Sequence, residues 1–343
     1  MTNLSWSFAS IWNESLEQGR TERPYKARET IWAGEVGGAM LDRYQKFFGV
    51  KPSNPYDVRS LRKFEAGNIW EWIVGIVLKR AGLLHSSQKW VKYQYPHCLS
   101  VTGKKDYEIG GKFDFEKAQA ELHDLELPEF LDRTIDNVLA YFKEKYPDGL
   151  PVAPLEIKSV GSFMFERYWV LQTADPRHKM QLFHYLKADN QPEGHLVLIS
   201  KDDCRMIEVG VLNPSPIENE YKKDIEQFSK YIFGKTTPPK EPEIVYQPET
   251  GRFSQNFKVA YSQYLTLNYG YKNQAEFDAK YKPQIAKWNR TLNRMVNGDN
   301  MTKLNLETIA EIKKTFPNLD EIVERDKKLK AEGLLEEVSE DNG

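Results

Sequence analysis

The predicted fold depends above all on one segment near the middle of the chain, Leu155-Glu156-Ile157-Lys158. Side chains alternate between the two faces of an extended strand, so Glu156 and Lys158 lie side by side on the same face. A carboxylate next to an amine on one strand is half of the site that a metal-dependent phosphodiesterase needs. The other half has to come from elsewhere in the chain.

A second short strand is predicted upstream, over Gly110-Gly111-Lys112-Phe113-Asp114-Phe115, where the two aromatic side chains point away from the face that carries Asp114. Phosphodiester cleavage needs a hard divalent cation, and Mg²⁺ prefers carboxylate, carbonyl and water oxygens. Asp114 and Glu156 would supply two carboxylates and Ile157 a backbone carbonyl. The Lys158 ammonium would orient the attacking water and stabilise the developing negative charge.

A third acid, Glu71, is the only charged side chain between Ala66 and Leu78. The surrounding apolar residues predict a helix over 61–81 that is buried on most faces. Because buried charges are paired or bind metal, Glu71 is a candidate metal ligand. The alternatives are that Glu71 faces solvent or pairs with an arginine.

A polar pair, Gln181 and Tyr185, lies one helical turn apart in a helix predicted at about 176–188, so both side chains can reach the same site. His178 lies one turn earlier on that face. An ordinary helix with a polar stripe gives the same pattern, and only the neighbouring strand motif favours the functional interpretation.

Four motifs follow one another along the chain and together resemble the PD-(D/E)xK nuclease superfamily: Gly67-x-x-x-Glu71, Gly111-Lys112-Phe113-Asp114, Glu156-Ile157-Lys158 and Gln181-x-x-x-Tyr185. The resemblance covers about residues 60–212 and is greatest to the exonuclease branch. That branch includes the lambda-type viral recombination exonucleases, the YqaJ-like proteins and the RecB nuclease domain. The order of the motifs carries the resemblance, because each motif alone is common.

The resemblance implies an α/β fold with a restriction-endonuclease-like core, in which helices flank a mixed central β-sheet. It implies that Asp114 and Glu156 are metal ligands and catalytic, with Glu71 as the acid on the helix. Lys158 would be the catalytic lysine, and Gln181 and Tyr185 the supporting helix motif. The implied cofactor is Mg²⁺ or Mn²⁺.

Three features depart from the family pattern. The separation between Asp114 and Glu156 is longer than the family usually shows, so the helix predicted over 131–142 would be an excursion from the sheet. Trp70 stands where many RecB-like members carry histidine, which favours the lambda-type version that uses Glu71. The chain has only Cys98 and Cys204, so no iron-sulfur cluster is expected.

Bulk composition predicts one large domain with an appended module, since the chain has 343 residues of which 40% are hydrophobic. The formal net charge of -2 gives no global attraction to phosphate, so nucleic-acid binding would need a local basic surface. No apolar run is long enough for a bilayer, and the first residues lack the pattern of a secretory signal. We therefore expect a cytoplasmic protein with reduced thiols and no membrane partner.

The expected domain organisation has three parts. Residues 1–234 form the nuclease domain, with N-terminal helices at 28–48 and 61–81 and a helical insertion at about 117–150. Residues 235–250 contain four prolines and predict a linker, and residues 251–343 predict a helical C-terminal module. Within the domain, strands at 90–102 and 107–115 would form a hairpin around Gly103-Lys104-Lys105; further strands are expected at 194–200 and 205–212, and a helix at 217–233.

Basic residues begin two of the predicted helices. Arg62 and Lys63 precede Glu71, while Arg177, His178 and Lys179 open the helix of Gln181. Both groups are candidates for binding the nucleic-acid backbone, and solvated helix faces are the alternative. Aromatic and basic residues also alternate within 269–294, where core aromatics with solvated lysines are favoured over a single-strand binding surface.

The combined hypothesis is a Mg²⁺- or Mn²⁺-dependent deoxyribonuclease that uses water as its nucleophile. An exonuclease for DNA recombination or repair in a bacteriophage is favoured, acting on a duplex end or a single strand. Two alternatives stay open: a structure- or site-specific endonuclease, and an inactive nucleic-acid-binding or assembly protein on the same fold. The expected partners are DNA and a recombination or single-strand-binding protein, and an oligomer is compatible with the sequence.

Overall fold

The computed structural model describes residues 8–21, 25–80, 82–111, 137, 140–141 and 144–333, which form two compact units. The first unit contains the chain up to Lys51 together with Tyr56–Pro238, and the second contains Pro52–Pro55 together with the chain from Pro239 onward. The main division falls within the segment predicted as a linker. Pro52–Pro55, which the sequence assigns to the first domain, instead joins the second unit, where the side chain of Asn54 donates to the Lys272 carbonyl (2.8 Å).

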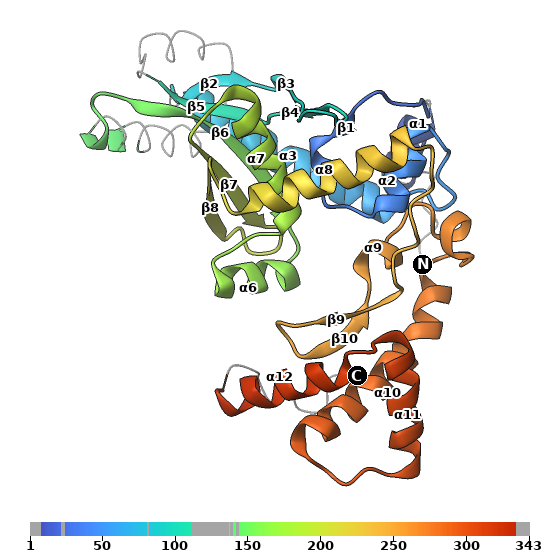
Figure 1. The fold of residues 1–343 in the computed structure, drawn as a ribbon. Coiled ribbons are helices and arrows are strands. Elements are labelled where there is room, and N and C mark those ends of the chain that lie inside the picture. Colours follow the sequence, from blue (N-terminus) through green and yellow to red (C-terminus); the bar gives the residue numbers. More distant parts are fainter. Residues whose placement is uncertain are drawn as a thin grey trace. The chain divides into compact units, whose positions relative to one another are not determined.

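The first unit is built on a five-stranded mixed sheet in the order β2-β5-β6-β7-β8 (Figure 1). β6 runs parallel to β7, and the other neighbouring pairs are antiparallel. The strands are β2 (Leu84–Ser87), β5 (Tyr107–Gly111), β6 (Leu150–Val160), β7 (Glu193–Ser200) and β8 (Met206–Leu212). The predicted α/β fold with a mixed central sheet is therefore confirmed.

Helices cover this sheet because its strands are apolar on both faces. On one side, Leu155 and Ile157 of β6 pack with Leu78 of α3 (Val58–Arg80). The opposite face carries a larger core in which strand residues such as Leu196 and Leu198 pack with α7 (Pro176–Asp189). Two more helices complete the unit around the sheet: α6 (Ser162–Leu171) and α8 (Ile217–Phe233).

A second, three-stranded sheet in the order β1-β4-β3 corrects the predicted hairpin. β4 (Val101–Lys104) pairs with β3 (Trp90–Tyr93) and β1 (Ile31–Trp32), whereas β5 pairs with β2 and β6. The chain therefore passes from one sheet to the other at Gly103-Lys104-Lys105, and this segment does not form a hairpin turn. Glycine is needed at 103 because a Cβ there would lie 2.6 Å from the ring of Tyr185.

The N-terminal segment contains a helix that was not predicted, α1 (Phe8–Thr21), and only the second half of the helix predicted at 28–48. Its elements are α1, strand β1, a short 3-10 turn (Ala33–Glu35) and α2 (Met40–Phe47). The first half of the helix predicted at 28–48 is thus strand and turn. The predicted helix over 131–142 in the insertion lies largely outside the described residues.

The second unit is helical and also contains a β-hairpin. β9 (Ile244–Gln247) and β10 (Arg252–Gln255) pair antiparallel, so part of the predicted linker is a strand. The other elements are α9 (Phe257–Ala260), a π-helical turn (Leu265–Tyr269), α10 (Gln274–Asn297), α11 (Lys303–Thr315) and α12 (Leu319–Ala331). Tyr281 and Trp288 are buried in this unit's core, as the favoured structural interpretation of the aromatic residues requires.

Across the described ranges, the structure contains no helix with the length and hydrophobicity that crossing a membrane would demand.

Candidate active site

Strand β6 places an ion pair at the centre of the candidate site. Glu156 is completely buried, and its Oε1 forms an ion pair with the Lys158 Nζ, as expected for two residues on one face of a strand. The side chain of Lys158 remains 26% exposed. The pair therefore joins a buried carboxylate to a lysine whose side chain is partly exposed.

Helix α7 holds this carboxylate from the other side. The amide nitrogen of Gln181 donates to Glu156 Oε1 (2.7 Å) and to the Tyr185 hydroxyl (2.8 Å). The Tyr185 hydroxyl in turn donates to the Lys104 carbonyl (3.0 Å). Two residues one helical turn apart thus connect β6 to the passage that precedes β5.

The acid that the structure places beside Glu156 is Asp106, whereas Asp114 lies outside the described residues. Asp106 immediately precedes β5, whose first residue, Tyr107, pairs with Leu155. Its Oδ2 accepts the backbone N–H of Ile157 (3.0 Å), so the side chain reaches across to β6. Sequence reasoning missed Asp106 because Gly103-Lys104-Lys105 suggested a turn. The acid that directly follows this segment was the one feature of the sequence that could have indicated a site residue there.

Glu71 approaches the same site from α3. Its Oε1 accepts a hydrogen bond from the Gln88 side chain (2.6 Å), and its backbone carbonyl accepts one from the Tyr107 hydroxyl (2.8 Å). Partial burial, followed by the negative charge of Asp106, raises the pKa of Glu71. Gln88 is thus its partner, in place of the arginine that was considered as an alternative.

Burial has the largest effect on the pKa values of the acids in this site, and the neighbouring negative charge adds to it. Burial raises the pKa of Glu156 to about 8; Lys158 lowers it and Asp106 raises it further. Although burial opposes the charge on Lys158, the acids around it raise the pKa of its ammonium group. Lys158 faces three acids, Glu71, Asp106 and Glu156, and Lys104 adds a second positive charge near Glu71.

The arrangement fits a divalent cation held by few protein ligands. Glu156 Oε2 is buried and has no hydrogen-bond partner among the described residues, and a buried carboxylate oxygen ordinarily has one. The described part of the chain contains no group of three or more His, Cys, Asp and Glu side chains that could hold a metal ion. Mg²⁺ commonly binds through one or two carboxylates and keeps several waters, so the pair Asp106 and Glu156 suits it. The Ile157 carbonyl remains a predicted ligand.

The predicted phosphate-binding residues differ in their environment. Arg62 and Lys63 are exposed on α3. Arg177 instead donates to both carboxylate oxygens of Asp175, through Nε (3.1 Å) and a terminal nitrogen (2.8 Å), and Lys179 donates to Thr173 (2.6 Å).

His178 does not supply the predicted cation. Burial and the nearby charge of Lys158 lower the pKa of His178 to about 4, so its imidazole is neutral at pH 7. The imidazole therefore lies near the site without a charge, and a contact between His178 and the nucleic-acid backbone stays a prediction.

Comparisons with known proteins add little to this geometry. No protein-family model matches the chain, and no curated protein matches it. Among solved structures, the chain is similar to SSO0001, with 14% sequence identity and a TM-score of 0.40 over 68% of this chain and 90% of that chain. A likeness this distant carries no argument about function.

Proposed function

We propose that this protein is a metal-dependent DNA nuclease with a restriction-endonuclease-like core, in which Asp106 and Glu156 hold Mg²⁺ or Mn²⁺ beside Lys158. An exonuclease of cytoplasmic DNA recombination or repair, of the bacteriophage type, is the favoured form. The single observation that carries the proposal is the uncompensated acid around Glu156. Glu71 and Glu156 have raised pKa values even though Lys158 is present, and Glu156 Oε2 has no partner among the described residues.

A bound divalent cation would supply the missing positive charge, activate water and neutralise the developing charge on the phosphate. Water attacks phosphorus, the bond to the leaving nucleotide oxygen breaks, and a proton ends on that oxygen. Lys158 orients the attacking water and stabilises the negative transition state through its ammonium group. Gln181 fixes Glu156 Oε1 by its hydrogen bond, which leaves Oε2 for the cation. Tyr185 keeps the Gln181 amide in place.

DNA binding in this proposal depends on lysine and arginine side chains that can still contact phosphate. Arg62 and Lys63 are exposed on the helix that also carries Glu71, so phosphates that approach Lys158 can reach them. Arg177 and Lys179 are committed to contacts with Asp175 and Thr173, and we give them a smaller share of DNA binding.

The direct test is cleavage of labelled linear duplex and single-stranded DNA by the purified protein with Mg²⁺ or Mn²⁺. We expect cleavage that EDTA abolishes and that Glu156→Gln removes. Glu226→Gln is the matched control, since Glu226 is an exposed acid on α8. DNA that stays intact with both metals while the protein still binds it would contradict the proposal and favour the binding-protein alternative.

Two further comparisons refine the proposal. Cleavage of linear DNA with covalently closed circles left intact identifies an exonuclease, whereas cleavage of both identifies the endonuclease alternative. Asp106→Asn and Asp114→Asn should be compared in the same assay. We expect Asp106→Asn to abolish cleavage; if only Asp114→Asn does so, the metal ligand is the acid that the sequence motif indicated.

A further inference from the structure

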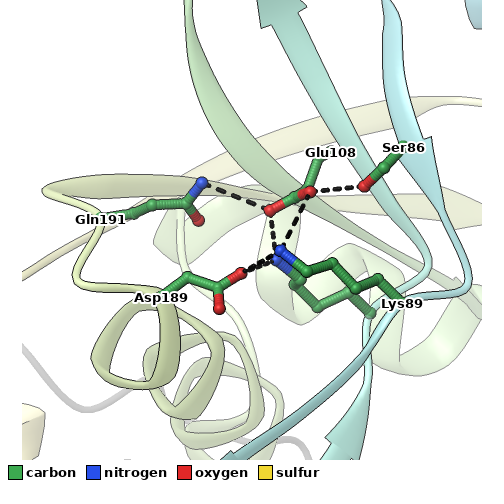
Figure 2. A network of polar contacts seen from close by, with 6 residues as sticks. Ser86, Lys89, Glu108, Asp189 and Gln191 are labelled. Atoms are coloured by element: carbon green, nitrogen blue, oxygen red, sulfur yellow. Dashed lines mark hydrogen bonds and ion pairs between the residues drawn. The ribbon is translucent and has the colours of Figure 1, made fainter.

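A second cluster of buried charge is centred on Lys105, the residue before Asp106. Figure 2 shows Glu108, Asp189 and Lys89 of this cluster, together with Ser86 and Gln191. Lys105 is only 1% exposed, and its Nζ forms ion pairs with Glu108 of β5 and Asp189 at the end of α7. Lys89 contacts the same two carboxylates from the rim, at 3.1 Å from Asp189 and 3.9 Å from Glu108. We call these four residues the Lys105 cluster.

The Lys105 cluster is balanced and rigidly connected. Ser86 of β2 and Gln191 also donate hydrogen bonds to Glu108, one to each carboxylate oxygen, and so restrict its orientation. Burial alone would raise the pKa of Glu108, but the contacts with Lys105 and Ser86 outweigh it and lower the pKa. Asp189 behaves in the same way, because Lys105 and Lys89 offset its burial. Two cations thus meet two anions, and the cluster has no charge left for a ligand.

The position of the Lys105 cluster gives it a role beyond stability. Asp106 lies in the chain between Lys105 and Glu108, two members of the cluster. On its N-terminal side, the Lys104 carbonyl accepts from Tyr185, and the Lys105 N–H donates to the Lys89 carbonyl (3.0 Å). The helix that holds Glu156 through Gln181 therefore also holds the backbone of Asp106, through Tyr185 and Asp189.

We propose that Lys105 is a positioning residue that fixes Asp106 relative to Glu156 and thereby sets the affinity of the site for a divalent cation. This inference rests on the proposed function. Mg²⁺ and Mn²⁺ require defined positions of their oxygen ligands, and loss of groups that orient ligands typically lowers metal affinity about 10- to 100-fold. Lys105 touches neither the cation nor the substrate, so it acts only through Asp106.

The test is Mn²⁺ binding measured by isothermal titration calorimetry on the metal-free protein, well below its unfolding temperature. We expect Lys105→Met to raise the Kd for Mn²⁺ about tenfold. Lys89→Met is the matched control, because it removes a lysine from the same two carboxylates at the exposed rim, and its Kd should stay within about twofold of the wild-type value. Asp189→Asn removes one charge from the partners of Lys105 while keeping its shape, so it provides a milder variant if Lys105→Met does not fold.

The outcomes separate this inference from the proposed function. If the wild-type protein binds no Mn²⁺, or Glu156→Gln binds it equally well, the proposed function fails and the inference fails with it. If Glu156→Gln loses binding while Lys105→Met and Asp189→Asn bind as the wild type does, only the positioning role is overturned. A purely structural role would lower the unfolding temperature of these variants and leave the Kd of the folded protein unchanged.

Discussion

Two groups of buried charge on neighbouring strands of one sheet behave in opposite ways. In the Lys105 cluster, two lysines face two carboxylates, and the pKa values of Glu108 and Asp189 are lowered. Around Glu156, Lys158 faces three acids with only Lys104 as a further cation near Glu71, and the pKa values of Glu71 and Glu156 are raised. Burial is the largest influence on the raised pKa values of Glu71 and Glu156, whereas around Glu108 and Asp189 the contacts with lysine outweigh it.

The comparison teaches how to separate structural from functional acids. Glu108 and Glu156 are almost equally buried, and each contacts a lysine. Exposed area and pairing with one lysine therefore do not distinguish them. The net effect of burial and neighbouring charge does, because an acid that its neighbours leave uncompensated is suited to bind a cation from solution.

The largest difference between the two groups should appear in catalysis. Lys158→Met is expected to abolish DNA cleavage because it removes the cation that stabilises the transition state, while Mn²⁺ binding is largely retained. Cleavage rates and calorimetric Mn²⁺ titrations measure the two effects. Lys222→Met, on the exposed face of α8, is the control and should cleave at the wild-type rate. Normal cleavage by Lys158→Met would remove Lys158 from the mechanism.

Stability should change in opposite directions when one charge is removed from each group. Lys105→Met leaves two buried carboxylates short of a partner and should lower the free energy of unfolding by about 3–5 kcal/mol. Glu156→Gln removes a buried acid that lacks compensation and should raise it by about 1 kcal/mol in metal-free buffer. Urea unfolding at pH 7 measures both. If both variants lose a similar amount of stability, the claim that the two groups differ in their balance of charge is contradicted.

His184, a buried residue on α7, belongs neither to the Lys105 cluster nor to the group around Glu156, but it should make the stability of the protein depend on pH. Burial lowers the pKa of His184 to about 4, below the ordinary 6.5 of the unfolded chain. The unfolded state therefore binds more protons at this residue between these values. The contribution of His184 to stability is full above pH 6.5, and it falls by about 3 kcal/mol as the pH approaches 4. Urea unfolding across this range should show a shallower slope for His184→Gln, and an unchanged slope would contradict the assignment.

Metal addition should stabilise the protein only through the Glu156 group. At a Mn²⁺ concentration of 100 times the Kd, the free energy of unfolding should rise by about 2.7 kcal/mol. Thermal unfolding with and without Mn²⁺ measures this rise, which Glu156→Gln should lose and Lys89→Met should keep. An equal response of all three proteins would indicate binding elsewhere.

Lys89→Met should have the smallest effect, less than about 1 kcal/mol on unfolding, because half-exposed ion pairs contribute little. The side chain of Lys89 is 49% exposed, whereas that of Lys105 is 1% exposed, although both contact the same carboxylates. Urea unfolding of the two lysine variants side by side isolates the effect of burial. Equal losses would show that charge number, and not burial, governs the Lys105 cluster.

The sequence predicted the parts of the fold that depend on local periodicity. The helices over 61–81, 176–188 and 217–233 and the strands around β6, β7 and β8 appear at or near the predicted positions. The neighbourhood of Glu156, Lys158, Gln181 and Tyr185 follows from their spacing along one strand and one helix.

The missed features depend on contacts between distant segments. β5 pairs with β6 across the insertion and does not fold back on β4, which no local pattern between 90 and 115 indicates. That pairing brings Asp106 to Ile157. In the sequence, Asp106 directly follows Gly103-Lys104-Lys105, which was interpreted as a turn, so Asp106 was not recognised as a site residue. The neutral state of His178 also depends on burial, which its polar neighbours in the sequence concealed.

The most direct test of the central claim is a calorimetric Mn²⁺ titration of the wild-type protein beside Asp106→Asn and Glu156→Gln. We predict one divalent-cation site in the wild type that is lost in both variants, since both carboxylates are needed to hold the ion. Wild-type affinity in either variant would contradict the claim that Asp106 and Glu156 share one cation.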